Sequence, residues 1–222
     1  MPDWLYHTLR FLHPFGMFLA FAAAPIALGS TKGGRRHVRA GQVFAAGMTL
    51  GAVAGIGLSL NHSPPAYALL YFGFITLFYV ASGYLAPRIG RGSVDDYRWD
   101  RAATALGVAA SVAMIWYGLL EFTARALIGG DVIYGGIGLA VGVNHARWRG
   151  PADPSRWRVE HLTSLTAAYQ VVWYFVFALY IPVLPRAAQV LLPASVGVAA
   201  ILWMRRRFGN TRSTVSLEAL AS

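Results

Sequence analysis

The sequence predicts an all-α integral membrane protein: a bundle of about seven transmembrane helices, with the N-terminus outside and the C-terminus in the cytoplasm. Three observations predict this class: an apolar composition with few charges, a series of apolar runs of membrane-spanning length, and a concentration of arginine in alternate loops. Residues 1–207 are expected to form a single transmembrane domain, and residues 208–222 a polar cytoplasmic tail.

The composition of the chain is that of a lipid-embedded protein. Of its 222 residues, 56% are hydrophobic and 13% charged, against roughly 25% charged in a soluble domain. The mean hydropathy is +0.49. The net charge of +10 does not indicate a nucleic-acid partner, because the basic residues form short clusters between apolar runs rather than a basic face on a soluble body. The absence of cysteine excludes disulfides and thiolate metal sites.

Seven apolar runs are separated by charged or turn-rich breaks. Most contain the roughly 20 residues that cross about 30 Å of hydrocarbon. The fifth is short and rich in glycine, so its crossing is the least certain of the seven. The predicted spans are 11–29, 40–60, 66–86, 102–121, 131–146, 162–184 and 187–204.

The basic residues set the orientation. Sixteen of the 19 lie in the loops after the first, third and fifth spans and in the C-terminal tail, and only three, Arg10, Arg125 and Arg186, lie on the other side. Short cytoplasmic loops carry the excess of lysine and arginine in membrane proteins. The basic side is therefore predicted to be cytoplasmic. All basic residues except Lys32 are arginine, which is typical of a GC-rich bacterial genome, so we expect a multi-pass protein of the bacterial inner membrane.

Five of the six histidines fall into two layers. His13 lies just inside the outer end of the first span, and His62 follows the outer end of the second. At the inner ends, His37 begins the second span, His145 ends the fifth and His161 begins the sixth. The two layers are about 24 Å apart at 1.5 Å per helical residue, so residues of different layers cannot ligate one metal ion.

Paired histidines on different helices are what a bis-histidine b-type haem requires. The layers predict two haem b pairs, His13 with His62 outside and His37 with His161 inside. The alternative is that each is a boundary residue that caps a helix or bonds a lipid headgroup. Arginines for the haem propionates are Arg10 outside and Arg35, Arg36 and Arg158 inside.

Other chemistries have less support. His145 is a candidate metal ligand at the inner surface, together with His161 and either Asp153 or Glu160. A covalent retinal pigment is excluded because Lys32, in a loop, is the only lysine. An ion pathway would show carboxylates in mid-membrane, and none is found there. Zincin, nucleophile-elbow, Walker and Rossmann motifs are absent.

Two patches resemble a family of predicted bacterial multi-pass membrane proteins of unknown function. The first runs from His13 to Met48 and has the family's "GG..H...G" turn at Gly33, Gly34, His37 and Gly41; the second, His161 to Tyr169, is similar to its later "H...m..sy.a" helix. The family's polar motif residues fall on His13, His37 and His161. Leu165 stands where a methionine is usual, and Glu160 replaces an arginine. Cytochrome b561-type proteins are similar only in architecture.

Three functions remain from this reading. The first is a membrane-embedded haem electron-transfer or reductase-like protein. The second is a non-catalytic accessory or assembly subunit of a larger respiratory or photosynthetic membrane complex, with glycine and aromatic faces against partner helices, pigments or lipids. The third, a carrier, is disfavoured by the missing mid-membrane charge. The predicted partners are the lipid bilayer and, for the accessory function, other subunits of a membrane complex; whether the chain is an enzyme stays open.

Overall fold

A computed structural model describes residues 1–62, 66–90, 98–125, 129–147 and 154–209. Every element in these ranges is an α-helix, which confirms the predicted all-α class. Most of the polar tail predicted for 208–222 lies outside the described residues. The helices are α1 (Asp3–Gly29), α2 (Arg35–Asn61), α3 (Tyr67–Ile89), α4 (Arg98–Arg125), α5 (Gly130–Arg147), α6 (Pro154–Tyr180) and α7 (Arg186–Gly209).

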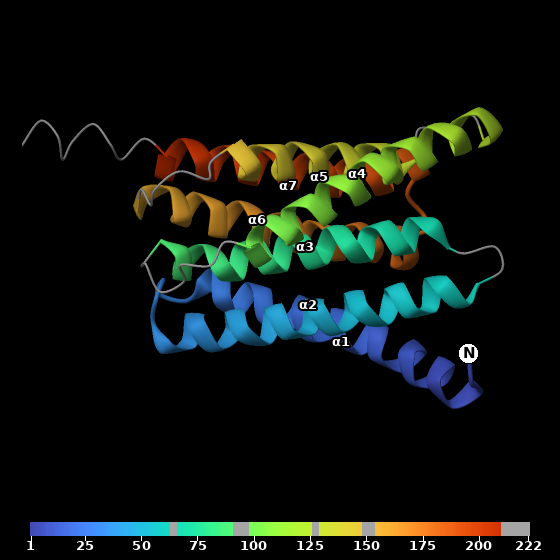
Figure 1. The fold of residues 1–222 in the computed structure, drawn as a ribbon, viewed down its shortest axis with the longest axis horizontal. Coiled ribbons are helices and arrows are strands. Elements are labelled where there is room, and N and C mark those ends of the chain that lie inside the picture. The colour runs from blue at the N-terminus through green and yellow to red at the C-terminus, as the bar shows by residue number, and fades with distance from the viewer. Residues whose placement is uncertain (63–65, 91–97, 126–128, 148–153, 210–222) are drawn as a thin grey trace, which may run out of the picture.

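The helices run up and down along one common direction (Figure 1). α1 packs on α2, α4 on α5 and α6 on α7, while α3 contacts α2, α4 and α6 and so joins the pairs. Because successive helices alternate in direction, the segments rich in lysine and arginine gather at one end of the bundle, opposite the N-terminus. We call this the arginine-rich end; it contains Lys32, Arg39, Arg88, Arg147 and Arg207.

Six of the seven helices are long and apolar enough to cross a membrane. The exception is α5, whose 18 residues include Asp131 near the start and Asn144, His145 and Arg147 at the end. These polar ends lower its hydropathy, although its length of about 27 Å nearly matches a hydrocarbon layer. The six apolar helices fit a multi-pass membrane protein, and α5 is the helix that the sequence also leaves least certain.

The outer surface of the bundle is apolar. Phe18 of α1 is 67% exposed, Trp116 of α4 65% and Val196 of α7 69%. Such side chains around the middle of a bundle face lipid rather than water, because lipid solvates apolar groups without cost. The surface therefore agrees with the composition in indicating contact with membrane lipid.

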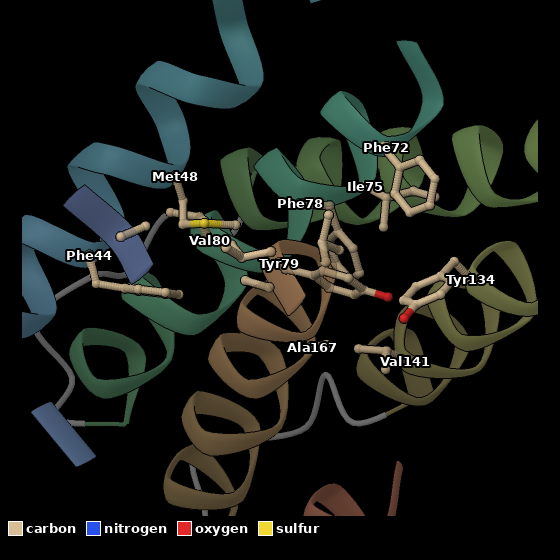
Figure 2. Close-up of a cluster of buried hydrophobic side chains, with 14 of the residues drawn as sticks. Phe44, Met48, Phe72, Ile75, Phe78, Tyr79, Val80, Tyr134, Val141 and Ala167 are labelled. Carbon is tan, nitrogen blue, oxygen red and sulfur yellow. The ribbon is translucent and has the colours of Figure 1, made fainter. Parts of the chain in front are cut away.

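The core is centred on α3. Ile75, Phe78 and Tyr79 of this helix are each no more than 2% exposed. Figure 2 shows them between Met48 of α2 and Tyr134 of α5. Side chains packed at this density hold helices together by van der Waals contact, which is the main attraction available where lipid is as apolar as the core.

Glycines bring α1 and α2 into direct backbone contact. A Cβ built on Gly16 would lie 2.6 Å from the carbonyl oxygen of Gly47, and one on Gly47 would lie 2.7 Å from the carbonyl oxygen of Gly16. No real side chain fits at such distances, so the two positions require glycine. The glycine stripe of α2 is thus used for helix packing.

The predicted end of the sixth span is wrong. The sixth span was expected to run to Leu184, but α6 ends at Tyr180 and α7 begins at Arg186. Between them, the backbone N–H of Leu184 donates to the carbonyl of Ile181 in a turn. Pro182 and Pro185 lack the N–H groups that a continuing helix needs, so the apolar run contains the turn rather than more helix.

Candidate functional site

His37 is held by the end of the preceding helix. Its Nδ1 lies 2.9 Å from the carbonyl oxygen of Ala27. That carbonyl is among the last four of α1, which have no donor within the helix. Lys32 caps the same end, with Nζ 2.7 Å from the carbonyl oxygen of Leu28. α2 begins six residues after α1 ends, so the imidazole of His37, near the start of α2, lies against the end of α1.

His161 is held by a carbonyl of α3 that a proline has left without its helical donor. Its Nδ1 lies 2.7 Å from the carbonyl oxygen of Gly83. In a regular helix that oxygen would accept from the N–H four residues later, but this residue is Pro87, inside α3, which has no N–H. The imidazole takes over the missing bond and links α6 to α3.

The two bonds fix the same tautomer in both rings. A carbonyl oxygen only accepts, so Nδ1 of His37 and of His161 carries the proton and donates it. When such a ring is neutral, its Nε2 is an acceptor with a free lone pair, which is the form that binds metals.

The structure brings His37 and His161 together. Their ring centroids are 6.3 Å apart and the ring planes are inclined by 68°, and both side chains are half-buried. One helical turn after His37, Gly41 lies on the same side of α2, and a Cβ built there would meet no atom within 4 Å. α2 therefore leaves open space at Gly41, one turn from His37.

His13 and His62 are not brought together. Nδ1 of His13 lies 2.8 Å from the carbonyl oxygen of Gly51, and the ring packs on Gly55, where a Cβ would lie 3.0 Å from Nδ1. His62 caps the end of α2 and is exposed. It lies seven residues beyond Gly55, about 10 Å farther along the helix. The two residues were predicted to share a layer, but the tight α1–α2 packing places His13 deeper.

His145 is engaged on both sides by carboxylates. Its Nε2 is 2.8 Å from Oδ1 of Asp100, and its Nδ1 is 2.6 Å from Oε1 of Glu160. Asp100 is 4% exposed and His145 8%. Two carboxylate acceptors require both ring nitrogens to donate, so the ring is an imidazolium in this arrangement. The cluster ties the ends of α4, α5 and α6 together.

This arrangement does not favour the metal role considered for His145. With both ring nitrogens donating, the ring offers no lone pair to a metal ion. Within the described ranges, no group of three or more ligating side chains is placed to hold a metal. Asp153, named as a possible ligand, lies outside the described residues.

The sequence reading missed two residues that shape the site. One is Asp100, for which no role was predicted, although an acid at the start of an apolar helix is a signal for a buried partner. Pro87 was not noticed as the cause of a free carbonyl, although a proline four residues after Gly83 marks one directly. The partner of each, on another helix, was not visible from spacing.

The arginines expected near the haem propionates lie at the surface. Arg35 and Arg36 are exposed at the start of α2, beside His37. The guanidinium of Arg158 lies 5.5 Å from the ring centroid of Trp157 at the start of α6. All three lie at the arginine-rich end with the inner histidines, whereas Arg10 is exposed on α1 near the opposite end.

Comparison of the chain with protein-family models, curated proteins and solved structures finds no match. The family resemblance of the histidine and glycine patterns therefore stays a prediction.

Proposed function

We propose that the chain is a membrane-embedded electron carrier that binds one haem b between His37 and His161. The observation that carries the proposal is this pair: two rings from different helices, 6.3 Å apart, each with Nδ1 bonded to a backbone carbonyl. The proposal includes the orientation indicated by the arginine split, with the arginine-rich end in the cytoplasm and the chain in a bacterial inner membrane.

The residues fit the group in chemistry. Imidazole nitrogen binds metal ions at about 2 Å, so two imidazoles on opposite sides of one iron have ring centroids about 6 Å apart. Axial histidines commonly donate the other ring nitrogen to a carbonyl, which sets the tautomer and the ring orientation. Both properties are present in His37 and His161. Gly41, one turn from His37, carries no side chain, and a Cβ built there would meet no atom within 4 Å.

The chain's own groups supply binding and orientation. A bound haem b provides one-electron transfer between ferric and ferrous iron. The carbonyls of Ala27 and Gly83 hold the two rings, the half-buried position limits water, and Arg35, Arg36 and Arg158 provide guanidinium groups for carboxylates at the same end. We leave His13 and His62 out of the proposed site, since Nδ1 of His13 is bonded to the carbonyl of Gly51 and His62 is exposed at the end of α2.

An absorption spectrum tests the proposal. Full-length protein, expressed with a supplied haem precursor and purified in detergent, is expected to show a Soret band and a sharp α band after dithionite. His37→Gly and His161→Gly are expected to lose the reduced α band, and added imidazole is expected to restore it by replacing the missing side chain.

The control is His7→Gly, since His7 is exposed and its ring lies against that of its neighbour Tyr6; its spectrum is expected to equal that of the unmodified chain. A preparation without a Soret band would reject the electron-carrier function. If such a preparation also co-purified with a stable multi-subunit complex, it would support the accessory-subunit function instead.

A further inference from the structure

A groove in the outer surface lies between α2, α3 and α4. It has a volume of about 800 Å³, near the upper end of the range for small-molecule sites. α3 packs on both α2 and α4, and its buried Phe78 and Val80 line the groove. From Gln42 to Val53 the lining of α2 extends about 16 Å along the helix axis, close to the depth of one leaflet of a bilayer.

Most of the residues that line the groove are apolar. Basic residues lie where the groove opens toward the arginine-rich end of the bundle. On α2 the lining residues Gln42, Ala46, Thr49 and Val53 follow one face of the helix, and Arg39 continues that face three residues before Gln42 and seven before Ala46. Arg39 is exposed. It therefore lies at the mouth of the groove, on the face that lines it.

A second arginine is fixed at the same mouth by α3. Tyr84 lines the groove, and Nη2 of Arg88 donates to its hydroxyl at 2.8 Å, with the guanidinium 4.1 Å from the ring centroid. On α4, Trp99 lies four residues before the lining residue Ala103 and is 77% exposed. Tryptophan and tyrosine in such positions mark the headgroup level of a membrane.

We infer that this groove binds one anionic glycerophospholipid, with its acyl chains against α3 and its phosphate at Arg39 and Arg88. Basic pockets between membrane helices on the cytoplasmic side are suited to anionic headgroups, and the apolar length below them suits acyl chains. The site is separate from the proposed haem site, because His37 precedes Arg39 by two residues and lies about 200° around α2. The inference does not depend on haem binding.

Native mass spectrometry of the full-length protein tests the lipid site. The protein is delipidated in detergent and incubated with equal amounts of phosphatidylglycerol and phosphatidylcholine of identical acyl chains. We expect one retained phosphatidylglycerol per chain and at least about tenfold less phosphatidylcholine. Arg39→Ala with Arg88→Ala is expected to weaken phosphatidylglycerol retention by about thirtyfold, since each arginine at the membrane surface strengthens binding of an anionic lipid by about fivefold.

Two controls distinguish the groove from general surface attraction. Arg206→Ala with Arg207→Ala removes the same amount of charge from exposed positions on α7, also at the arginine-rich end of the bundle. This pair is expected to leave retention of phosphatidylglycerol unchanged. Ala46→Trp fills the groove with the charges intact and is expected to weaken retention, whereas Val196→Trp on the exposed face of α7 is not. Equal retention of the two lipids, equal loss in both arginine pairs, or full retention in Ala46→Trp would each overturn the inference.

Discussion

The inner and outer histidines of this bundle look alike in the sequence and differ in the structure. His37 and His161 meet at a ring-centroid distance of 6.3 Å, while His13 lies against the glycines of α2 and His62 stays exposed at a helix end. The rings of His37 and His161 are each bonded to a carbonyl that has no donor within its own helix: one at the end of α1, the other freed by Pro87.

The hydrogen bond of His13, in the outer layer, goes to a different kind of acceptor. The carbonyl of Gly51, which accepts from His13, lies in the middle of α2 and has the N–H of Gly55 as its helical donor. The bond of His13 is therefore an addition to a complete helix. The bonds of His37 and His161 go to carbonyls that have no donor within their own helix, although the carbonyl of Ala27 also accepts from Nζ of Lys32 at 3.2 Å. They fix both rings in one tautomer at neighbouring positions. Two histidines at a similar depth in the membrane therefore come together only where the backbone carbonyls that accept from them lie close to one another.

The largest expected effect is a loss of stability on substitution of His145, the third inner histidine, which lies outside the proposed haem site of His37 and His161. His145→Leu leaves Asp100 and Glu160 buried together without their cation, and breaking such a cluster costs about 3–5 kcal/mol. We expect thermal unfolding in detergent to shift down by about 10 °C, while the folded protein keeps the band positions of its haem spectrum. His7→Leu, at an exposed position, is the control and is expected to leave the midpoint in place. Loss of the spectrum without loss of stability would assign His145 to the haem site.

The next effect tests the vacant acceptor on α3. Pro87→Ala supplies the missing N–H, which competes with His161 for the carbonyl of Gly83. Stability is expected to stay equal or rise, while haem affinity falls about tenfold, as is common when the group that orients a ligating histidine is lost. Haem titration of the apoprotein measures the affinity. The matched variant is Pro193→Ala in α7, and an equal loss there would show that the effect is not specific to His161.

A smaller effect is expected in the outer layer. His13→Ala removes a bond to a carbonyl that keeps its helical donor, so the free energy of unfolding is expected to fall by only about 1 kcal/mol. The haem spectrum is expected to stay unchanged. A lost α band in His13→Ala would break the distinction between the layers.

The smallest effect belongs to His62. This residue is exposed at the end of α2, so His62→Ala is expected to change neither stability beyond about 0.5 kcal/mol nor the haem spectrum. Thermal unfolding and absorption measured on one preparation check both. A spectral change would restore the outer haem pair predicted from the sequence.

The helices could be predicted from sequence because lipid imposes length and apolarity on each of them separately. The apolar runs correspond to the helices, and the arginine-rich breaks to the helix ends and the segments between them. The fifth run was predicted to be the weakest span, and α5 is the helix whose polar ends lower its hydropathy. The predicted end of the sixth span was wrong because Ile181 and Leu184 continue the apolar run through a turn that contains proline.

The site could be predicted only in part. The depths of His37 and His161 follow from their places in the chain, and this sufficed to group them. Their partners do not, since the carbonyls of Ala27 and Gly83 become acceptors through helix ends and packing between helices. The cluster of His145 with Asp100 and Glu160 depends on three helix ends meeting, which spacing along the chain does not encode.

The central claim is that one haem b is bound per chain, between the two inner histidines. Its most direct test is the haem-to-protein ratio of the purified full-length chain, with haem measured as the pyridine haemochrome and protein by amino-acid analysis. We predict a ratio of one. A ratio of zero would contradict haem binding, and a ratio of two would contradict the restriction to His37 and His161.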